Sequence, residues 1–142
     1  MLQIRKNCFE TNSSSTHSLV LCENDDYEAL LHNEAFLSGS MYYDPVIVRK
    51  EDLLRNLDEE CDKYIKDKWK KYCKETGLNP ESVDDFANEI IAGFDKADTD
   101  LMYEFYTLDQ MWENSELETF DQGFTTKDGN IIHAFGCHGY LG

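Results

Sequence analysis

The sequence predicts an α+β fold in which one small sheet, built from N-terminal and C-terminal strands, is covered by three or four helices. Three observations support this prediction. Strand-like segments occur at both ends of the chain, segments with helical periodicity fill the middle, and 142 residues with 41% hydrophobic content suffice for one domain but not for two ordinary ones. We therefore expect residues 1–142 to form a single domain that needs no disulfide or metal to fold.

Strand-like segments lie near both ends of the chain. Leu2 to Arg5 alternates apolar and polar side chains, and Leu19 to Leu21 is a short apolar run typical of a buried strand. Residues 117–126 and 130–135 flank an Asp-Gly pair at 128–129, which favours a tight hairpin turn. We therefore expect the two terminal regions to pair in one sheet.

The middle of the chain carries the helical pattern. Asn24 is a typical capping residue, and residues 25–37 are expected to form a helix behind it. After a short strand at residues 46–48, residues 51–76 are expected to form one long helix that ends at Gly77. Its inward stripe recurs at steps of three and four residues: Leu54, Leu57, Cys61, Ile65, Trp69 and Tyr72.

Two further helical segments follow. The pair Asn79-Pro80 predicts a helix with Pro80 at its first helical position, and the apolar stripe of this helix ends at Phe94. Thr99 is a candidate cap for another helical segment that reaches Trp112. Residues 105–108 also fit a strand, so both assignments stay open at that point.

Charge is the most informative bulk property of the chain. It holds 29 acidic and 13 basic residues, and residues 75–142 alone carry a net charge of −13. Such a surface repels nucleic-acid phosphates and attracts basic protein surfaces, although acidic charge can also serve solubility alone. We expect no direct nucleic-acid binding and a partner protein with a basic nucleic-acid-binding surface. The expected contact surface is an acidic face made of Asp84, Asp85, Glu89, Asp95, Asp98 and Asp100.

Cysteine usage and hydropathy indicate a cytoplasmic protein without a membrane span. Five irregularly spaced cysteines do not form the pattern of a secreted disulfide framework, and no apolar run is long enough to cross a bilayer. His133, Cys137 and His138 could join Cys8, His17 or Cys22 in a zinc site if the terminal strands pair. No Cys-x-x-Cys pair is present, so we expect neither a metal nor another cofactor.

The segment from residue 12 to residue 18 is unusually rich in hydroxyl side chains. Hydroxyls and backbone amides can hold an anion, and a basic side chain on the preceding strand could add positive charge. The candidate anion-binding loop comprises Arg5, Asn12, Ser13, Ser14, Ser15, Thr16 and His17. Under this alternative the chain is an enzyme acting on a nucleotide or phosphate, with His17 in proton transfer. The competing interpretation is a wide connection whose hydroxyls bond to its own backbone.

The run Arg-Lys-Asn-Cys-Phe-Glu-Thr-Asn-Ser-Ser-Ser-Thr-His-Ser, residues 5–18, resembles the N-terminal signature of small uncharacterised bacteriophage proteins. Cys8 departs from this pattern, which usually has an aliphatic residue there. The resemblance implies a phage origin and a bacterial host cytoplasm. Small acidic phage proteins include anti-CRISPR proteins and DNA mimics, so the leading hypothesis is a binding protein that inhibits a host defence protein, such as a CRISPR effector, by occupying its basic groove.

Overall fold

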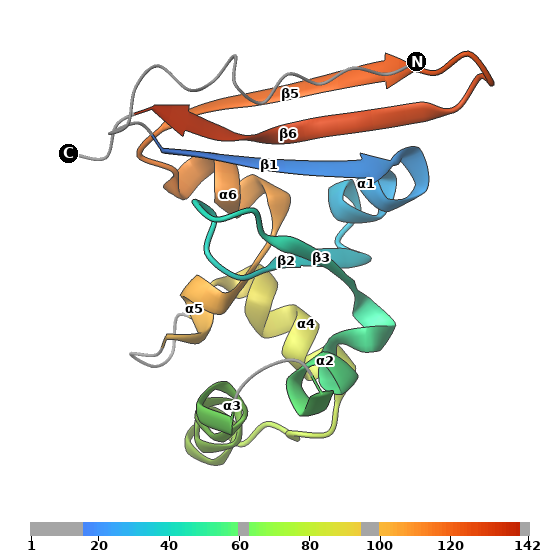
Figure 1. The fold of residues 1–142 in the computed structure, drawn as a ribbon. Coiled ribbons are helices and arrows are strands. Elements are labelled where there is room, and N and C mark those ends of the chain that lie inside the picture. The colour runs from blue at the N-terminus through green and yellow to red at the C-terminus, as the bar shows by residue number, and fades with distance from the viewer. Residues whose placement is uncertain (1–15, 60–62, 95–99, 140–142) are drawn as a thin grey trace.

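The computed structural model describes residues 16–59, 63–94 and 100–139, and the structural statements below concern these residues. One three-stranded antiparallel sheet brings the two ends of this part together in the order β1 (Thr16–Glu23), β6 (Ile131–Gly139) and β5 (Glu118–Thr125) (Figure 1). Val20 lies opposite Phe135, and a turn containing Gly129 joins β5 to β6. The predicted terminal sheet and hairpin are confirmed; the expected strand at residues 2–5 lies outside the described residues.

A second three-stranded antiparallel sheet lies below the first in Figure 1; the sequence predicted its strand at residues 46–48 but not the sheet. Its order is β3 (Val46–Arg49), β2 (Ala35–Ser38) and β4 (Phe105–Tyr106). The expected helix at 25–37 is therefore wrong beyond α1 (Asn24–Leu31). All four side chains of β2 are buried, so the strand lacks the alternation of apolar and polar residues that marks a half-buried strand.

The helices divide into two layers on either side of the second sheet. Figure 1 shows α1 and α6 (Leu108–Asn114) between the two sheets, and α2 (Leu53–Glu59), α3 (Lys63–Thr76) and α4 (Val83–Ala92) beyond the second sheet. The 3₁₀ turn η2 (Lys50–Asp52) leads from β3 into α2, and α5 (Leu101–Glu104) precedes β4. The α+β class is confirmed.

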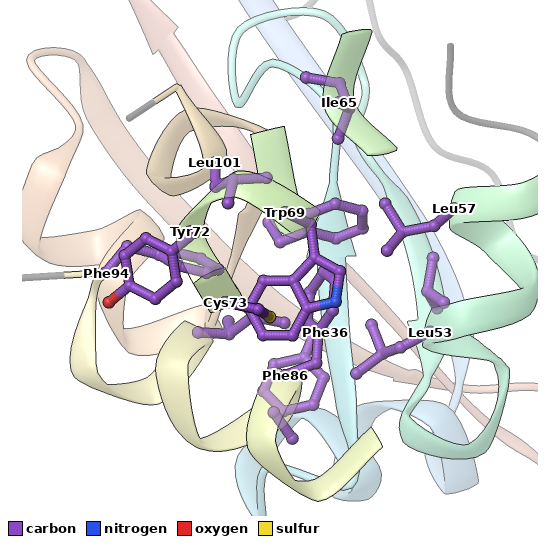
Figure 2. Packing of buried hydrophobic residues seen from close by; sticks show 14 residues of the cluster. Phe36, Leu53, Leu57, Ile65, Trp69, Tyr72, Cys73, Phe86, Phe94 and Leu101 are labelled. Carbon is purple, nitrogen blue, oxygen red and sulfur yellow. The ribbon is translucent and has the colours of Figure 1, made fainter. Parts of the chain in front are cut away.

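Two hydrophobic cores follow from this layering. The sheet core fills the space between the terminal sheet and the second sheet and comprises Val20, Cys22, Ala29, Leu30, Ala35, Leu37, Tyr106, Leu108, Met111, Leu117, Phe135 and Cys137. The helical core, shown in Figure 2, comprises Phe36, Val48, Leu53, Leu57, Ile65, Trp69, Tyr72, Cys73, Phe86, Ala87, Ile90, Phe94, Leu101 and Phe105. Successive residues of β2 belong to different cores, because side chains alternate between the faces of a strand.

The single long helix expected at residues 51–76 is wrong. The structure has two helices there, α2 and α3, and Lys66 Nζ lies 2.6 Å from Asp58 Oδ1, a contact that a straight helix cannot make eight residues apart. Leu57, Ile65, Trp69 and Tyr72 are buried as expected, Leu54 is partly buried, and Cys61 lies outside the described residues. The spacing of apolar residues shows which side of a helix is apolar. Two helices packed on one core have the same spacing as one long helix, so the pattern does not distinguish them.

The later helices begin at different caps from those expected. Ser82 Oγ accepts the Asp85 N–H at 3.1 Å, so α4 begins at Val83 rather than at Pro80, whose carbonyl accepts the indole N–H of Trp69. Farther on, Thr107 forms a capping box with Gln110 at the start of α6. Residues 101–114 are therefore helix, short strand and helix in turn, and Thr99 lies outside the described residues.

We expect Gly136→Ala to disrupt the terminal sheet. A Cβ atom at Gly136 would overlap the backbone carbonyl oxygen of Ser18 on the paired strand, and that oxygen cannot move without separating β1 from β6. The expected loss is about 2–3 kcal/mol of unfolding free energy, measured by urea unfolding. Gly123→Ala on β5 is the matched control, because its Cβ would meet only the His133 ring at 3.6 Å. Equal unfolding midpoints for the two variants would contradict the observed β1–β6 packing.

Candidate functional site

Charge is segregated between the two ends of the molecule. The acidic end, residues 16–49 and 100–139, contains 14 acidic and two basic residues. The helical end, residues 50–59 and 63–94, contains 10 acidic and eight basic residues. The terminal sheet brings acidic residues from the two ends of the chain together, so the net charge of −12 in the acidic end collects around both sheets, α1, α5 and α6 (Figure 1). Of these acids, Asp100 at the start of α5 contacts Tyr64 of the helical end.

The two basic residues of the acidic end offset little of this charge. Arg49 is held by Asp26, whose Oδ1 accepts hydrogen bonds from Arg49 Nε at 3.0 Å and Nη2 at 2.5 Å. The hydrogen bond to Asp26 raises the pKa of Arg49. Lys127 lies in the β5–β6 turn. The remaining carboxylates include exposed side chains on α1, α6 and β5, of which Glu28, Glu113 and Glu118 are examples.

The residues of the acidic face expected from the sequence already serve contacts within the chain. Asp84 Oδ1 pairs with Lys50 Nζ at 3.0 Å, and Asp85 Oδ2 accepts the Asn79 N–H at 3.1 Å. Glu89 accepts the Tyr72 hydroxyl, and Asp100 accepts the Tyr64 hydroxyl at 2.6 Å. Asp95 and Asp98 lie outside the described residues. Their joint role as a contact face stays a prediction, but the structure ties the four described carboxylates to neighbouring elements.

The candidate anion-binding loop falls largely outside the described residues. Arg5, Asn12, Ser13, Ser14 and Ser15 are not described, whereas Thr16 and His17 belong to β1 and lie opposite Gly139 and His138. The next residue, Ser18, is fully buried, and its hydroxyl donates to the Met41 carbonyl at 2.8 Å. Residues 16–18 therefore form strand rather than loop, and anion binding by the preceding residues stays a prediction.

The pairing of β1 with β6 decides the geometry of the proposed Cys/His cluster. Cys22 lies opposite His133 and Ser18 opposite Cys137, so these four residues face one side of the sheet. His138 is adjacent to Cys137 in the strand and therefore faces the other side. Within the described residues, no group of three or more His, Cys, Asp or Glu side chains is arranged to hold a metal ion.

A polar cluster that the sequence did not reveal fixes α1 on the terminal sheet. The Tyr27 ring stacks on His133 with centroids 3.8 Å apart, and its hydroxyl donates to the Asp121 carboxylate. His133 Nε2 lies 3.0 Å from Asn24 Oδ1. Burial, then the nearby carboxylates Asp26 and Asp121, raises the pKa of Cys22 to about 12, so its thiol stays protonated at neutral pH.

An open groove lies at one side of the acidic end, with a volume of about 600 Å³. It is formed by the β2–β3 loop, α5 and the α6–β5 connection, all at the left of Figure 1. The lining residues are Ser40, Met41, Tyr42, Met102, Tyr103, Glu104, Asn114 and Glu116. The Glu116 backbone N–H donates to the Tyr42 hydroxyl at 3.2 Å, which joins two walls of the groove.

We expect Glu89→Lys to destabilise the fold more than Asp84→Lys. Glu89 accepts the hydroxyl of Tyr72, whose side chain is buried in the helical core, so the substitution removes a charge-assisted hydrogen bond at a loss of about 2–3 kcal/mol. The Asp84 side chain is 74% exposed, and losing its pairing with Lys50 costs about 1 kcal/mol or less. Thermal unfolding of the two variants measures the difference. A larger loss for Asp84→Lys would contradict these assignments.

Comparison with known proteins adds no relative from which a role could be transferred. No protein-family model matches the chain, and no curated protein or solved structure matches it. No helix in the described part of the chain has the length and apolar character needed to cross a membrane. The function must therefore be inferred from the chain's own residues, and the phage signature at residues 5–18 remains an expectation from the sequence.

Proposed function

We propose that the chain is a binding protein without catalytic activity, and that its acidic end occupies a basic, nucleic-acid-binding surface of a host protein. One observation carries the proposal: among the residues that the structure describes, the acidic end holds 14 acidic and two basic residues. A surface of one sign attracts an oppositely charged groove and repels nucleic acid. Occupation of the groove would exclude the DNA or RNA that the partner normally binds.

The difference in charge between the two ends supports the proposal that the acidic residues form a binding surface and do more than keep the protein soluble. Charge that serves solubility alone can be spread over the whole molecule, whereas the described residues of the helical end include eight basic residues beside 10 acidic ones. Over residues 50–99 of the sequence the numbers are 14 acidic and nine basic, a smaller excess than that of the acidic end. A localised field orients a partner during diffusional encounter and accelerates association. The acidic end is therefore the face that a basic partner would meet first.

The resemblance of residues 5–18 to phage proteins suggests which basic partner is involved. A phage protein acts in the bacterial host cytoplasm, where defence proteins that bind DNA or RNA present basic grooves. An acidic protein that fills such a groove would act as a mimic of nucleic acid. We therefore propose a CRISPR effector, or another host protein of nucleic-acid metabolism, as the partner.

We expect charge reversal at the acidic end to weaken capture of basic partners strongly. The test variant combines Glu28→Lys, Glu113→Lys and Glu118→Lys, which are exposed positions on α1, α6 and β5. Immobilised parent protein is incubated with bacterial lysate, retained nucleic-acid-binding proteins are identified by mass spectrometry, and their association is then measured with purified proteins. The association rate should fall about tenfold or more in the test variant, and for the parent it should fall with rising salt.

The matched control carries the same change in net charge at the helical end. It combines Asp67→Lys, Glu75→Lys and Glu81→Lys, all at exposed positions. This control should bind nearly as well as the parent, and both variants must melt like the parent before binding is compared. Equal capture by the acidic-end variant and the parent would contradict the proposal, as would a captured partner that still binds its nucleic acid when saturated with the parent protein.

A further inference from the structure

We propose that the groove lined by Met41, Tyr42, Met102 and Tyr103 receives an arginine side chain of the basic partner. This inference rests on the proposed function in that it assumes a basic partner, and it identifies the anchoring contact. The groove lies within the acidic end, so the long-range field that attracts the partner also surrounds this contact. The chemistry of the groove walls then determines which side chain fits.

The groove walls expose the residue types that anchor protein interfaces. Tyr103 is 67% exposed and Met102 is 41% exposed, although both are large and apolar enough to be buried in a core. Tyr42 and Met41 face them from the β2–β3 loop. Tyrosine provides a rigid contact surface and methionine a deformable one, and both are enriched where proteins bind one another.

Carboxylates complete the groove and favour a positively charged occupant. Glu104 and Glu116 line it together with the uncharged residues, and no basic residue is among its described lining residues. Glu116 is exposed, and its backbone is held by the Tyr42 hydroxyl, so its carboxylate is attached to a fixed wall. An apolar peptide would leave the Glu116 charge beside an uncharged surface, whereas a cation would pair with it.

Arginine suits this combination of walls better than lysine. Its planar guanidinium stacks on aromatic rings, donates two parallel hydrogen bonds to a carboxylate, and is less strongly hydrated than an ammonium group. Its methylene stem can lie against the methionines while the charged head reaches the carboxylates. The volume of about 600 Å³ exceeds that of one side chain and leaves room for the flanking peptide backbone.

A second cavity, in the helical end, provides an internal contrast. It has a volume of about 390 Å³ and is lined in part by Lys66, Lys70 and Trp69. Lys66 pairs with Asp58 at 2.6 Å, so one carboxylate in the lining of this cavity already has a cationic partner. Two lysines in the lining repel a further cation, and an arginine peptide should therefore prefer the groove of the acidic end.

Methionine methyl NMR tests the inference directly, because the chain contains only four methionines. Met41 and Met102 line the groove, and Met111 is fully buried in the sheet core, where it serves as an internal reference. The probe is the blocked peptide acetyl-Gly-Arg-Gly-amide at millimolar concentration, compared with the same peptide carrying lysine or citrulline. Citrulline keeps the shape of arginine without its charge.

The arginine peptide should shift the Met41 and Met102 methyl signals and leave the Met111 signal unchanged. The lysine peptide should give smaller shifts, and the citrulline peptide none. Glu116→Gln should weaken the arginine affinity about threefold, within the usual range for one exposed ion pair. Tyr103→Ala should weaken it as well, whereas Glu81→Gln in the helical-end cavity should not.

Three results would overturn the inference. They are unshifted Met41 and Met102 signals, equal shifts with the arginine and citrulline peptides, and an unchanged arginine affinity in Glu116→Gln and Tyr103→Ala together. Failure of this inference can be distinguished from failure of the proposed function, because charge reversal at Glu28, Glu113 and Glu118 leaves the groove-lining residues intact. If that reversal strongly weakens partner binding while the peptide gives no shifts, the acidic end binds by another contact.

Discussion

The rest of the structure depends on one four-residue strand, Ala35–Ser38, that is buried on both faces. Phe36 packs into the helical core, while Ala35 and Leu37 pack into the sheet core. Its backbone pairs with both β3 and β4, so the strand also holds the second sheet together. A shift of one residue in its register would exchange the side chains of the two cores, and both would lose their packing.

The same layering separates the charges of the chain. The helical end carries Lys50 and the lysines of α3 and balances them with nearby acids, as in the Lys50–Asp84 and Lys66–Asp58 pairs. The pairing of β1 with β6 places the acidic residues of α1 beside those of the C-terminal half. Mutual repulsion among these carboxylates opposes folding, and the two cores offset it. A basic partner would relieve this repulsion, which is the physical basis of the proposed binding role.

Local signals account for what the sequence predicted. The Asp128-Gly129 turn and the apolar run at Leu19–Leu21 predicted the terminal sheet, because turn chemistry and strand composition act over a few residues. β2 was missed because burial on both faces removes its alternation, and the helix break between α2 and α3 was missed because both helices share one apolar side. The charge excess was visible in the sequence, but the groove was not, since residues 40–42, 102–104, 114 and 116 are brought together only by the fold.

The most direct test of the central claim, that the acidic end is the binding surface, is zero-length cross-linking of the complex with a captured basic partner. A carbodiimide joins a carboxylate to a lysine in contact with it, and mass spectrometry then identifies both residues. If the acidic end binds, the partner's lysines will be joined to carboxylates within residues 16–49 and 100–139. Cross-links confined to carboxylates of residues 50–59 and 63–94 would contradict the claim, because they would place the partner on the helical end.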